Sequence, residues 1–89
     1  MTRYSIPPDV ACATVEDGAV VLHMGTKRYF SLNETGAAIW RLLEEDVPFD
    51  EIAGKVTERY EVTLDDARAA VDELVTALEA SSLLALDRG

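Results

Sequence analysis

The sequence predicts an α+β fold in which a three-stranded antiparallel sheet precedes three helices. Residues 10–32 contain three β-rich runs separated by tight-turn signals. Three stretches between residues 33 and 78 place apolar residues at helical spacing instead. The length of 89 residues suits one domain with a modest core.

The strands are predicted as a meander. "VACATV" (10–15) and "AVVLHM" (19–24) flank "EDG", a hairpin signal, and "GT" separates the second run from "KRYFSL" (27–32). Side chains alternate along a strand, so Phe30 and Leu32 are expected to face the core and Tyr29 to face away from it.

The first helix is predicted to begin near Asn33, a favourable N-cap, with Glu34 at the positive end of the helix dipole. A capping box between Ser31 and Glu34 would start it one turn earlier, and the sequence leaves both boundaries open. The expected core stripe is Gly36, Ile39, Trp40 and Leu43.

The second helix is predicted over about residues 50–60, with Ile52, Val56 and Tyr60 inward. Thr63 opens the third helix, with Asp66 as a capping-box partner. The core face expected for the third helix is Ala67, Val71, Leu74, Val75 and Leu78. The tail "LLAL" (83–86) is expected to close the domain as a short extended segment.

The charge balance excludes several classes of partner. Eight basic residues against seventeen acidic ones give a net charge of −9. Phosphate backbones and anionic lipid surfaces would repel such a protein, so we expect neither a nucleic acid nor a membrane partner. A neutral or cationic peptide fits better. No apolar run is long enough to cross a bilayer and no signal peptide is evident, so a cytoplasmic protein is expected.

The sequence contains no recognisable catalytic constellation. Cys12 is the only cysteine, which excludes an internal disulfide and a cysteine-based metal cage, and it is expected to be a small buried residue. His23, the only histidine, lies in an apolar strand and is expected to be structurally satisfied. We therefore expect no enzyme, no cofactor and no metal site.

The second and third helices have the outline of a helix-turn-helix, and the sheet would make it a winged version. The would-be recognition helix argues against DNA. Between Leu64 and Ala80 it carries five acidic residues, Asp65, Asp66, Asp72, Glu73 and Glu79, against Arg68 alone. The scaffold is therefore expected to serve another purpose.

The stretch "RYFSLNETGAAIW" (28–40) resembles the strand-to-helix signature of PqqD-like proteins, through Leu32-Asn33, Thr35-Gly36 and Ile39-Trp40. The likeness continues through the two later helices and covers about residues 10–86, so the chain 1–89 resembles a single PqqD-like recognition domain. The family recognises leader peptides of ribosomally made, post-translationally modified peptides (RiPP recognition element). A stand-alone acidic form resembles the leader-binding protein of lasso-peptide biosynthesis. The resemblance implies a leader-cleaving protease and an ATP-dependent cyclase as partners.

The resemblance also implies that the leader pairs with the third strand and lies against the third helix. That strand has no proline and no bulge signal, as expected of an edge kept available for strand addition. Two alanines on the helix flank leave room for a peptide, and two acids suit a basic leader residue. The candidate peptide-binding residues are Lys27, Arg28, Tyr29, Phe30, Ser31, Asp66, Ala70, Glu73, Leu74 and Ala77.

Several alternatives remain open at this point. Many relatives carry an acidic residue where this chain has Ala70, and the helix flank is otherwise explained as a solvated face. Tyr29 suits either a cross-strand contact or a platform for the incoming strand. A peptide chaperone for a radical-enzyme pathway, such as pyrroloquinoline quinone maturation, and a winged-helix regulator are the alternative functions. The protein is expected to be a monomer or a weak homodimer through the edge strand.

Overall fold

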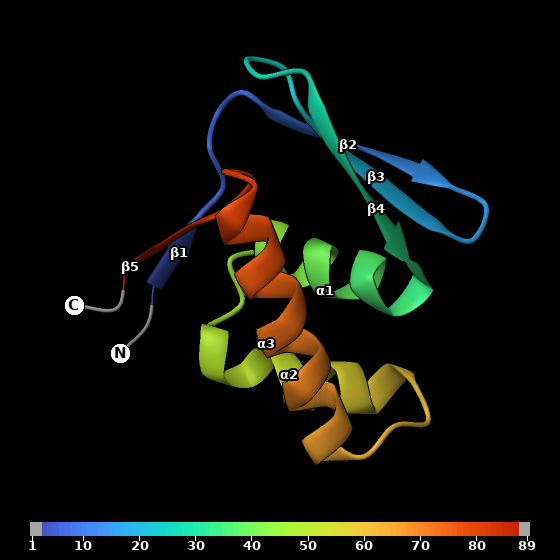
Figure 1. Ribbon diagram of the computed structural model, residues 1–89. Helices are drawn as coiled ribbons and strands as arrows, with labels where there is room; N and C mark the ends of the chain where they lie inside the picture. The colour runs from blue at the N-terminus through green and yellow to red at the C-terminus, as the bar shows by residue number, and fades with distance from the viewer. Residues whose placement is uncertain (1–2, 88–89) are drawn as a thin grey trace.

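A three-stranded sheet lies to one side of three helices in the computed structural model, which describes residues 3–87 (Figure 1). The strands are β1 (Arg3–Ser5), β2 (Val10–Val15), β3 (Gly18–His23), β4 (Arg28–Asn33) and β5 (Ala85–Asp87). The helices are α1 (Glu34–Glu44), α2 (Phe49–Arg59) and α3 (Leu64–Ala80). The predicted architecture of a meander followed by three helices is confirmed.

The meander has the strand order β2-β3-β4, with antiparallel pairing throughout. Gly18 pairs with Asn33 at one end of β3, and His23 pairs with Arg28 at the other. In the described part of the chain, β4 pairs with β3 alone and is therefore an edge strand, as predicted.

The glycine of the predicted hairpin signal has a different role from the expected one. Glu16 and Asp17 form the turn, and Gly18 is already the first residue of β3. A Cβ atom on Gly18 would lie 1.9 Å from the carbonyl oxygen of Leu32. Gly18 is therefore required for the close approach of β3 to β4 and not for the turn.

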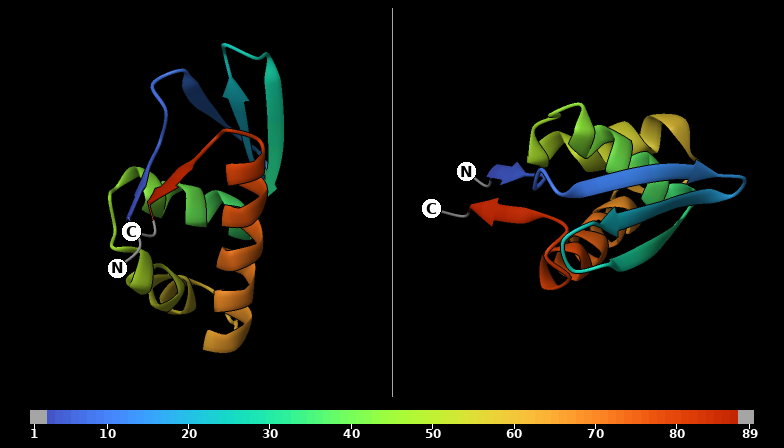
Figure 2. Two further views of the ribbon diagram at one scale, coloured as in Figure 1. Left: turned by 60° about the vertical axis from the view of Figure 1, so that its left-hand side comes forward. Right: turned by 90° about the horizontal axis from the view of Figure 1, so that it is seen from above.

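A second, two-stranded sheet joins β1 to β5 in antiparallel pairing, with Tyr4 opposite Leu86. The Tyr4 hydroxyl donates a 2.5 Å hydrogen bond to the carbonyl oxygen of Val47. The extended tail was predicted, but β1 was not. Since β5 pairs with β1 away from the meander, the tail leaves the outer edge of β4 uncovered (Figure 2).

Side-chain caps set two of the helix starts. The Asn33 Oδ1 atom accepts a 2.8 Å hydrogen bond from the Gly36 amide, so Asn33 caps α1 and Ser31 remains within β4. The Thr63 hydroxyl accepts a 3.1 Å hydrogen bond from the Asp66 amide at the start of α3. The second helix begins at Phe49, slightly before the predicted boundary.

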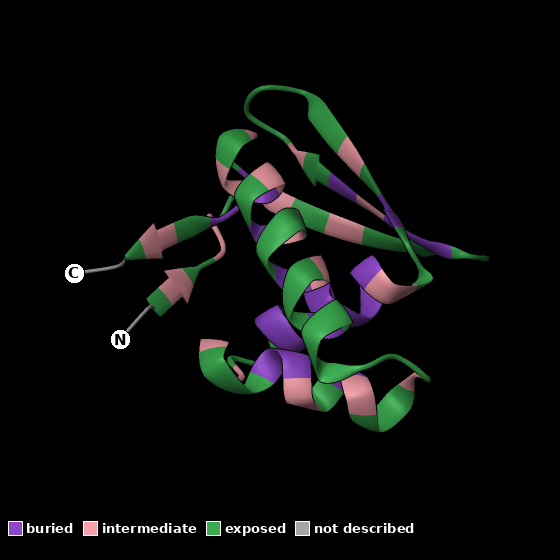
Figure 3. Ribbon diagram, turned by 60° about the horizontal axis from the view of Figure 1, so that its bottom comes forward, coloured by how far each residue is buried: buried purple, intermediate pink, exposed green. Residues whose placement is uncertain are grey.

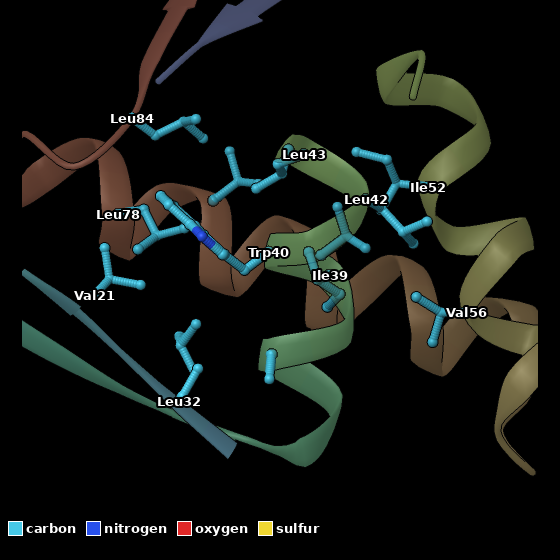
Figure 4. Close-up of a cluster of buried hydrophobic side chains, with 14 of the residues drawn as sticks. Val21, Leu32, Ile39, Trp40, Leu42, Leu43, Ile52, Val56, Leu78 and Leu84 are labelled. Atoms are coloured by element: carbon cyan, nitrogen blue, oxygen red, sulfur yellow. The ribbon is translucent and has the colours of Figure 1, made fainter. Parts of the chain in front are cut away.

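The core lies between the sheet and the three helices, with α1 at its centre (Figure 4). The predicted stripe of α1 is buried, and Trp40 is only 1% exposed. The other side of α1 is buried as well, at Ala37, Ala38 and Leu42, because this helix packs on β3, β4, α2 and α3. Among the described residues, the Trp40 indole N–H is the one fully buried side-chain polar group without a hydrogen-bond partner.

The third helix buries four of its five predicted core residues, namely Ala67, Val71, Val75 and Leu78. Leu74 is the exception, because it is only half-buried and lies at the margin of the core. Exposed residues follow the outer side of α3 (Figure 3). Within residues 3–87, no helix has the length and apolar character required to span a membrane.

Candidate functional site

A groove of about 350 Å³ lies between the edge strand and the third helix. The strand β4 and the start of α1 form one wall and the floor, and α3 forms the other wall. The third helix packs mainly on α1 and α2 and has little direct contact with β4, which leaves this space open. The residues that line it are Phe30, Ser31, Leu32, Asn33, Thr35, Gly36, Ile39, Ala70, Glu73, Leu74 and Ala77.

The strand side of the groove offers backbone hydrogen-bonding groups. An edge strand leaves alternate N–H and C=O groups without a partner strand, and these groups can pair with an added chain. All six residues of β4 pair with β3, so the strand is held in extended conformation along its whole length. Leu32 is buried on the core side and Phe30 is half-buried beside it, so both contribute apolar surface to the floor.

A histidine-capped turn leads into β4. The His23 Nδ1 atom accepts 3.1 Å hydrogen bonds from the amides of Gly25 and Thr26. Lys27 follows with a φ of 64°, in the left-handed region, and its amide donates to the His23 carbonyl oxygen over 2.8 Å. This turn accounts for the histidine through a structural role, in line with the sequence-based expectation.

The helix side of the groove is apolar except at one position. Ala70, Leu74 and Ala77 recur along α3 and are each half-buried. Glu73 is exposed and is the only charged residue among those that line the groove. Within residues 3–87, no hydrogen bond or ion pair occupies its carboxylate. The groove therefore combines an apolar surface with one available negative charge.

The structure brings six of the ten predicted binding residues into the groove: Phe30, Ser31, Ala70, Glu73, Leu74 and Ala77. The other four line no part of it. Lys27 and Arg28 are exposed at the turn before the groove, and Asp66 is exposed in the first turn of α3. Tyr29 faces the opposite side of the sheet and is 70% exposed.

Sequence reasoning missed five lining residues: Leu32, Asn33, Thr35, Gly36 and Ile39. These residues form the junction between β4 and α1, which we read only as a helix start and a core stripe. The absence of a side chain at Gly36 avoids crowding at the junction, since a Cβ atom there would lie 3.3 Å from Asn33 Oδ1 and 3.4 Å from the Leu32 side chain. The "Leu-Asn-x-Thr-Gly" motif itself was the available signal.

Cys12 lies away from the groove, on the core side of β2. Burial raises the pKa of the Cys12 thiol, the Glu44 carboxylate raises it further, and Arg41 partly offsets this. The thiol therefore stays protonated at neutral pH and is a poor nucleophile. The side chain is half-buried, whereas the sequence predicted a buried one.

The family model described as Coenzyme PQQ synthesis protein D (PqqD) matches residues 18–84, which include every element that forms the groove. The chain belongs to this family. Among curated protein sequences, none matches the chain significantly.

Two solved structures resemble this PqqD-family chain closely. The first, "TbiB1 in Complex with the TbiA(beta) Leader Peptide", is 33% identical with a TM-score of 0.80, over 89% of this chain and 92% of that one. The second, "Lasso peptide synthetase B1 complexed with the leader peptide", is 32% identical with a TM-score of 0.76, over 93% of this chain and 98% of that one. The fold is therefore that of PqqD-like leader-binding proteins.

Proposed function

We propose that this protein binds the leader region of a ribosomally made precursor peptide and delivers it to processing enzymes of lasso-peptide biosynthesis. The observation that carries the proposal is the open edge of β4 beside the groove along α3. Both similar solved structures are described as complexes with a leader peptide. The match to this chain covers 92% of the first solved chain and 98% of the second.

The proposed mode of binding is strand addition. The leader would pair through its backbone with β4, which gives affinity that depends little on sequence. Alternate leader side chains would then point into the groove. At about 350 Å³, the groove is at the lower end of ligand-pocket volumes and has room for a few apolar side chains.

The chemistry of the groove suggests which leader is preferred. Phe30, Ile39 and Leu74 favour one or two apolar leader residues, while Glu73 favours a basic residue next to them. The net charge of −9 would also attract a cationic leader over a longer range. Lys27 and Arg28, at the turn, would flank an acidic leader end. Asp66 lies in the first turn of α3, outside the groove, so it would not contact leader residues within the groove.

The proposal includes the partners and the place of action. We expect a non-catalytic adaptor that holds the leader while a leader-cleaving protease, and then an ATP-dependent cyclase, act on the rest of the precursor. A ribosomally made precursor is available in the cytoplasm, which is where the adaptor would meet it. The residues 1–89 would act as one recognition domain.

Titration of the cognate leader peptide, monitored by fluorescence anisotropy, tests the proposal. Glu73→Lys is expected to weaken binding of a leader with a basic residue about tenfold, because it replaces an attraction by a repulsion. Asp72→Lys is the matched control, since it makes the same charge change on α3 outside this groove, in the crevice between α2 and α3. We expect the control to change affinity less than twofold.

Amide-shift mapping in the same titration gives the location. Shifts are expected to concentrate on residues 28–33 and 70–77. If the leader binds no more tightly than a scrambled peptide of equal composition, the proposed function is wrong. If it binds but the shifts fall elsewhere, the function stands and the groove is not its site.

The family description also points to pyrroloquinoline quinone synthesis. The lasso-peptide assignment is preferred because both similar solved structures bind leader peptides and one is described as a lasso peptide synthetase component. Titration with precursor peptides of both pathways separates the two assignments.

A further inference from the structure

A hollow of about 420 Å³ lies beyond the C-terminal end of α1, and we call it the second hollow. It is bounded by Arg3 and Tyr4 of β1 and by residues 46–51, which connect α1 to α2 and begin α2 (Figure 1). The groove adjoins the start of α1 instead, so about 16 Å of helix separates the two. They share no lining residue, and both can be filled at the same time.

The floor of the second hollow is apolar. Tyr4, Val47 and Phe49 line it, and each is half-buried at the margin of the core. The hydrogen bond from the Tyr4 hydroxyl to the Val47 carbonyl oxygen fixes β1 against the connection between α1 and α2. The floor is therefore a shaped surface with room for one or two apolar side chains.

The rim of the second hollow carries an excess of negative charge. The carboxylates of Asp46, Asp50 and Glu51 stand against the guanidinium of Arg3. Asp50 and Glu51 belong to the first turn of α2, where the positive end of the helix dipole offsets part of their charge. Within residues 3–87, no hydrogen bond or ion pair engages the carboxylate of Asp46. Burial and then the Asp46 carboxylate raise the pKa of the Tyr4 hydroxyl, so the charge of Asp46 acts inside the hollow.

Asp46 occupies a backbone position that ordinarily belongs to glycine. The helix α1 ends in a Schellman motif, in which the Val47 amide donates to the Leu42 carbonyl oxygen over 3.1 Å and the Asp46 amide donates to that of Leu43 over 3.2 Å. The motif requires a left-handed residue between them, and Asp46 has a φ of 58°. Aspartate tolerates this conformation better than most residues, but glycine adopts it without a steric cost.

The charge of Asp46 is also unfavourable where it stands. The C-terminus of a helix is the negative end of its dipole and favours cations. Asp46 follows Glu44 and Glu45 at the end of α1, so three acids are adjacent there. Neither the backbone conformation nor the dipole therefore accounts for a carboxylate at this position. A residue that breaks two local preferences without compensation within the fold points to a role in binding.

We propose that the second hollow is a binding site for a short segment of a partner protein in which a basic residue stands next to an apolar one. The apolar side chain would enter the floor between Tyr4 and Phe49, and the basic side chain would pair with Asp46 at the rim. A single anchored side chain with a charge beside it suits a weak, transient contact and needs no large interface. This inference goes beyond the proposed function and does not depend on it.

The charge of the chain argues against a second copy as the occupant. Each copy has a net charge of −9, so two copies repel each other, whereas a basic segment is attracted.

Titration of the isotope-labelled full chain with the peptide acetyl-Arg-Leu-Lys-amide tests the proposal. We expect saturable amide shifts at residues 3–4 and 46–51. Acetyl-Glu-Leu-Glu-amide has the opposite charge, and acetyl-Arg-Gly-Lys-amide lacks the apolar side chain. Both are expected to bind there more weakly by at least about threefold.

Asp46→Asn removes the charge but keeps the size of the side chain and its tolerance of the left-handed backbone. We expect the affinity for acetyl-Arg-Leu-Lys-amide to fall about threefold to fivefold, while Tm rises because a negative charge leaves the end of α1. Asp17→Asn is the matched control, since Asp17 is an exposed aspartate in the turn between β2 and β3 and lines neither the groove nor the second hollow. The control is expected to leave the affinity unchanged.

The absence of saturable shifts at residues 46–51 with up to about 10 mM peptide, or equal affinity for the peptide of opposite charge, would overturn the proposal. Shifts confined to residues 28–33 and 70–77 would overturn it as well, because the peptide would then prefer the groove. Unchanged affinity in Asp46→Asn, or a lower Tm, would show that the carboxylate serves the fold. A homodimer in sedimentation that Asp46→Asn dissolves would give the hollow to a second copy and equally end the proposal.

Discussion

Gly18 lies where β3 packs closely against β4, and a methyl group has no room there. In Gly18→Ala, the new Cβ atom would be 1.9 Å from the Leu32 carbonyl oxygen and 2.9 Å from its carbonyl carbon. Both are backbone atoms of a paired strand, so neither can rotate away. The two strands must separate by about 1 Å, enough to lose the backbone hydrogen bonds at this end of the ladder.

The expected destabilisation follows from two terms. Overpacking costs about 1–3 kcal/mol, and each lost backbone hydrogen bond costs about 0.5–1.5 kcal/mol. We expect the free energy of unfolding to fall by about 2–3 kcal/mol. At about 4–8 °C per kcal/mol for a domain of this size, Tm should fall by about 8–24 °C.

Gly54→Ala is the matched control, because it makes the same chemical change inside α2. A Cβ atom on Gly54 would meet nothing within 4 Å. Alanine is a better helix former than glycine by about 1 kcal/mol, so Tm should rise by about 4–8 °C. Urea and thermal unfolding followed by circular dichroism measure both variants. If Gly18→Ala changes stability by less than about 0.5 kcal/mol, or if both variants shift in the same direction, the close-approach argument is wrong.

Three further predictions concern local features. Thr63→Ala should lower the free energy of unfolding by about 1 kcal/mol through loss of the cap on α3. Thr63→Ser should retain most of the stabilisation that the cap provides, and urea midpoints check both variants. His23→Phe should cost about 1 kcal/mol, since it removes the acceptor of two turn amides, and hydrogen exchange of those amides should accelerate. Stability should fall as pH rises above about 8.5, because Cys12 and Tyr4 both have pKa values raised in the folded state, Tyr4 by burial and by Asp46. Below that pH their contribution is fully present, and urea midpoints from pH 7 to 10.5 should show a smaller decline in Cys12→Ala.

The sequence was most informative where a structural signal and its partner lie close together in the chain. Asn33 and Thr63 each accept a hydrogen bond from an amide three residues ahead, so residue type and spacing pointed to both caps, although Ser31 remained an alternative start for α1 until the structure was known. The register of the meander likewise follows from short turns and alternation, which correctly placed Leu32 inward and Tyr29 outward.

The sequence was least informative where a segment pairs with a distant part of the chain, or where neighbouring elements determine how far a side chain is buried. The strand β1 pairs with residues at the other end of the chain, and a three-residue segment carries no periodic signal of its own. Leu74 fits the apolar stripe of α3, but a helical stripe cannot show which of its edges meets the core and which borders a groove. In a similar way, alternation along β4 placed Phe30 on the core side but could not show that it would be only half-buried beside the groove.

The pairing of β1 with β5 has a consequence for how the chain folds. Residues 3 and 87 are paired, so nearly the whole polypeptide forms a ring closed by one short ladder. Loop-closure entropy grows with the logarithm of length, and closing this ring costs about 2 kcal/mol more than closing a loop of about ten residues. We therefore expect the ladder to form last during folding and to open first during native-state fluctuations, independently of the meander and its edge.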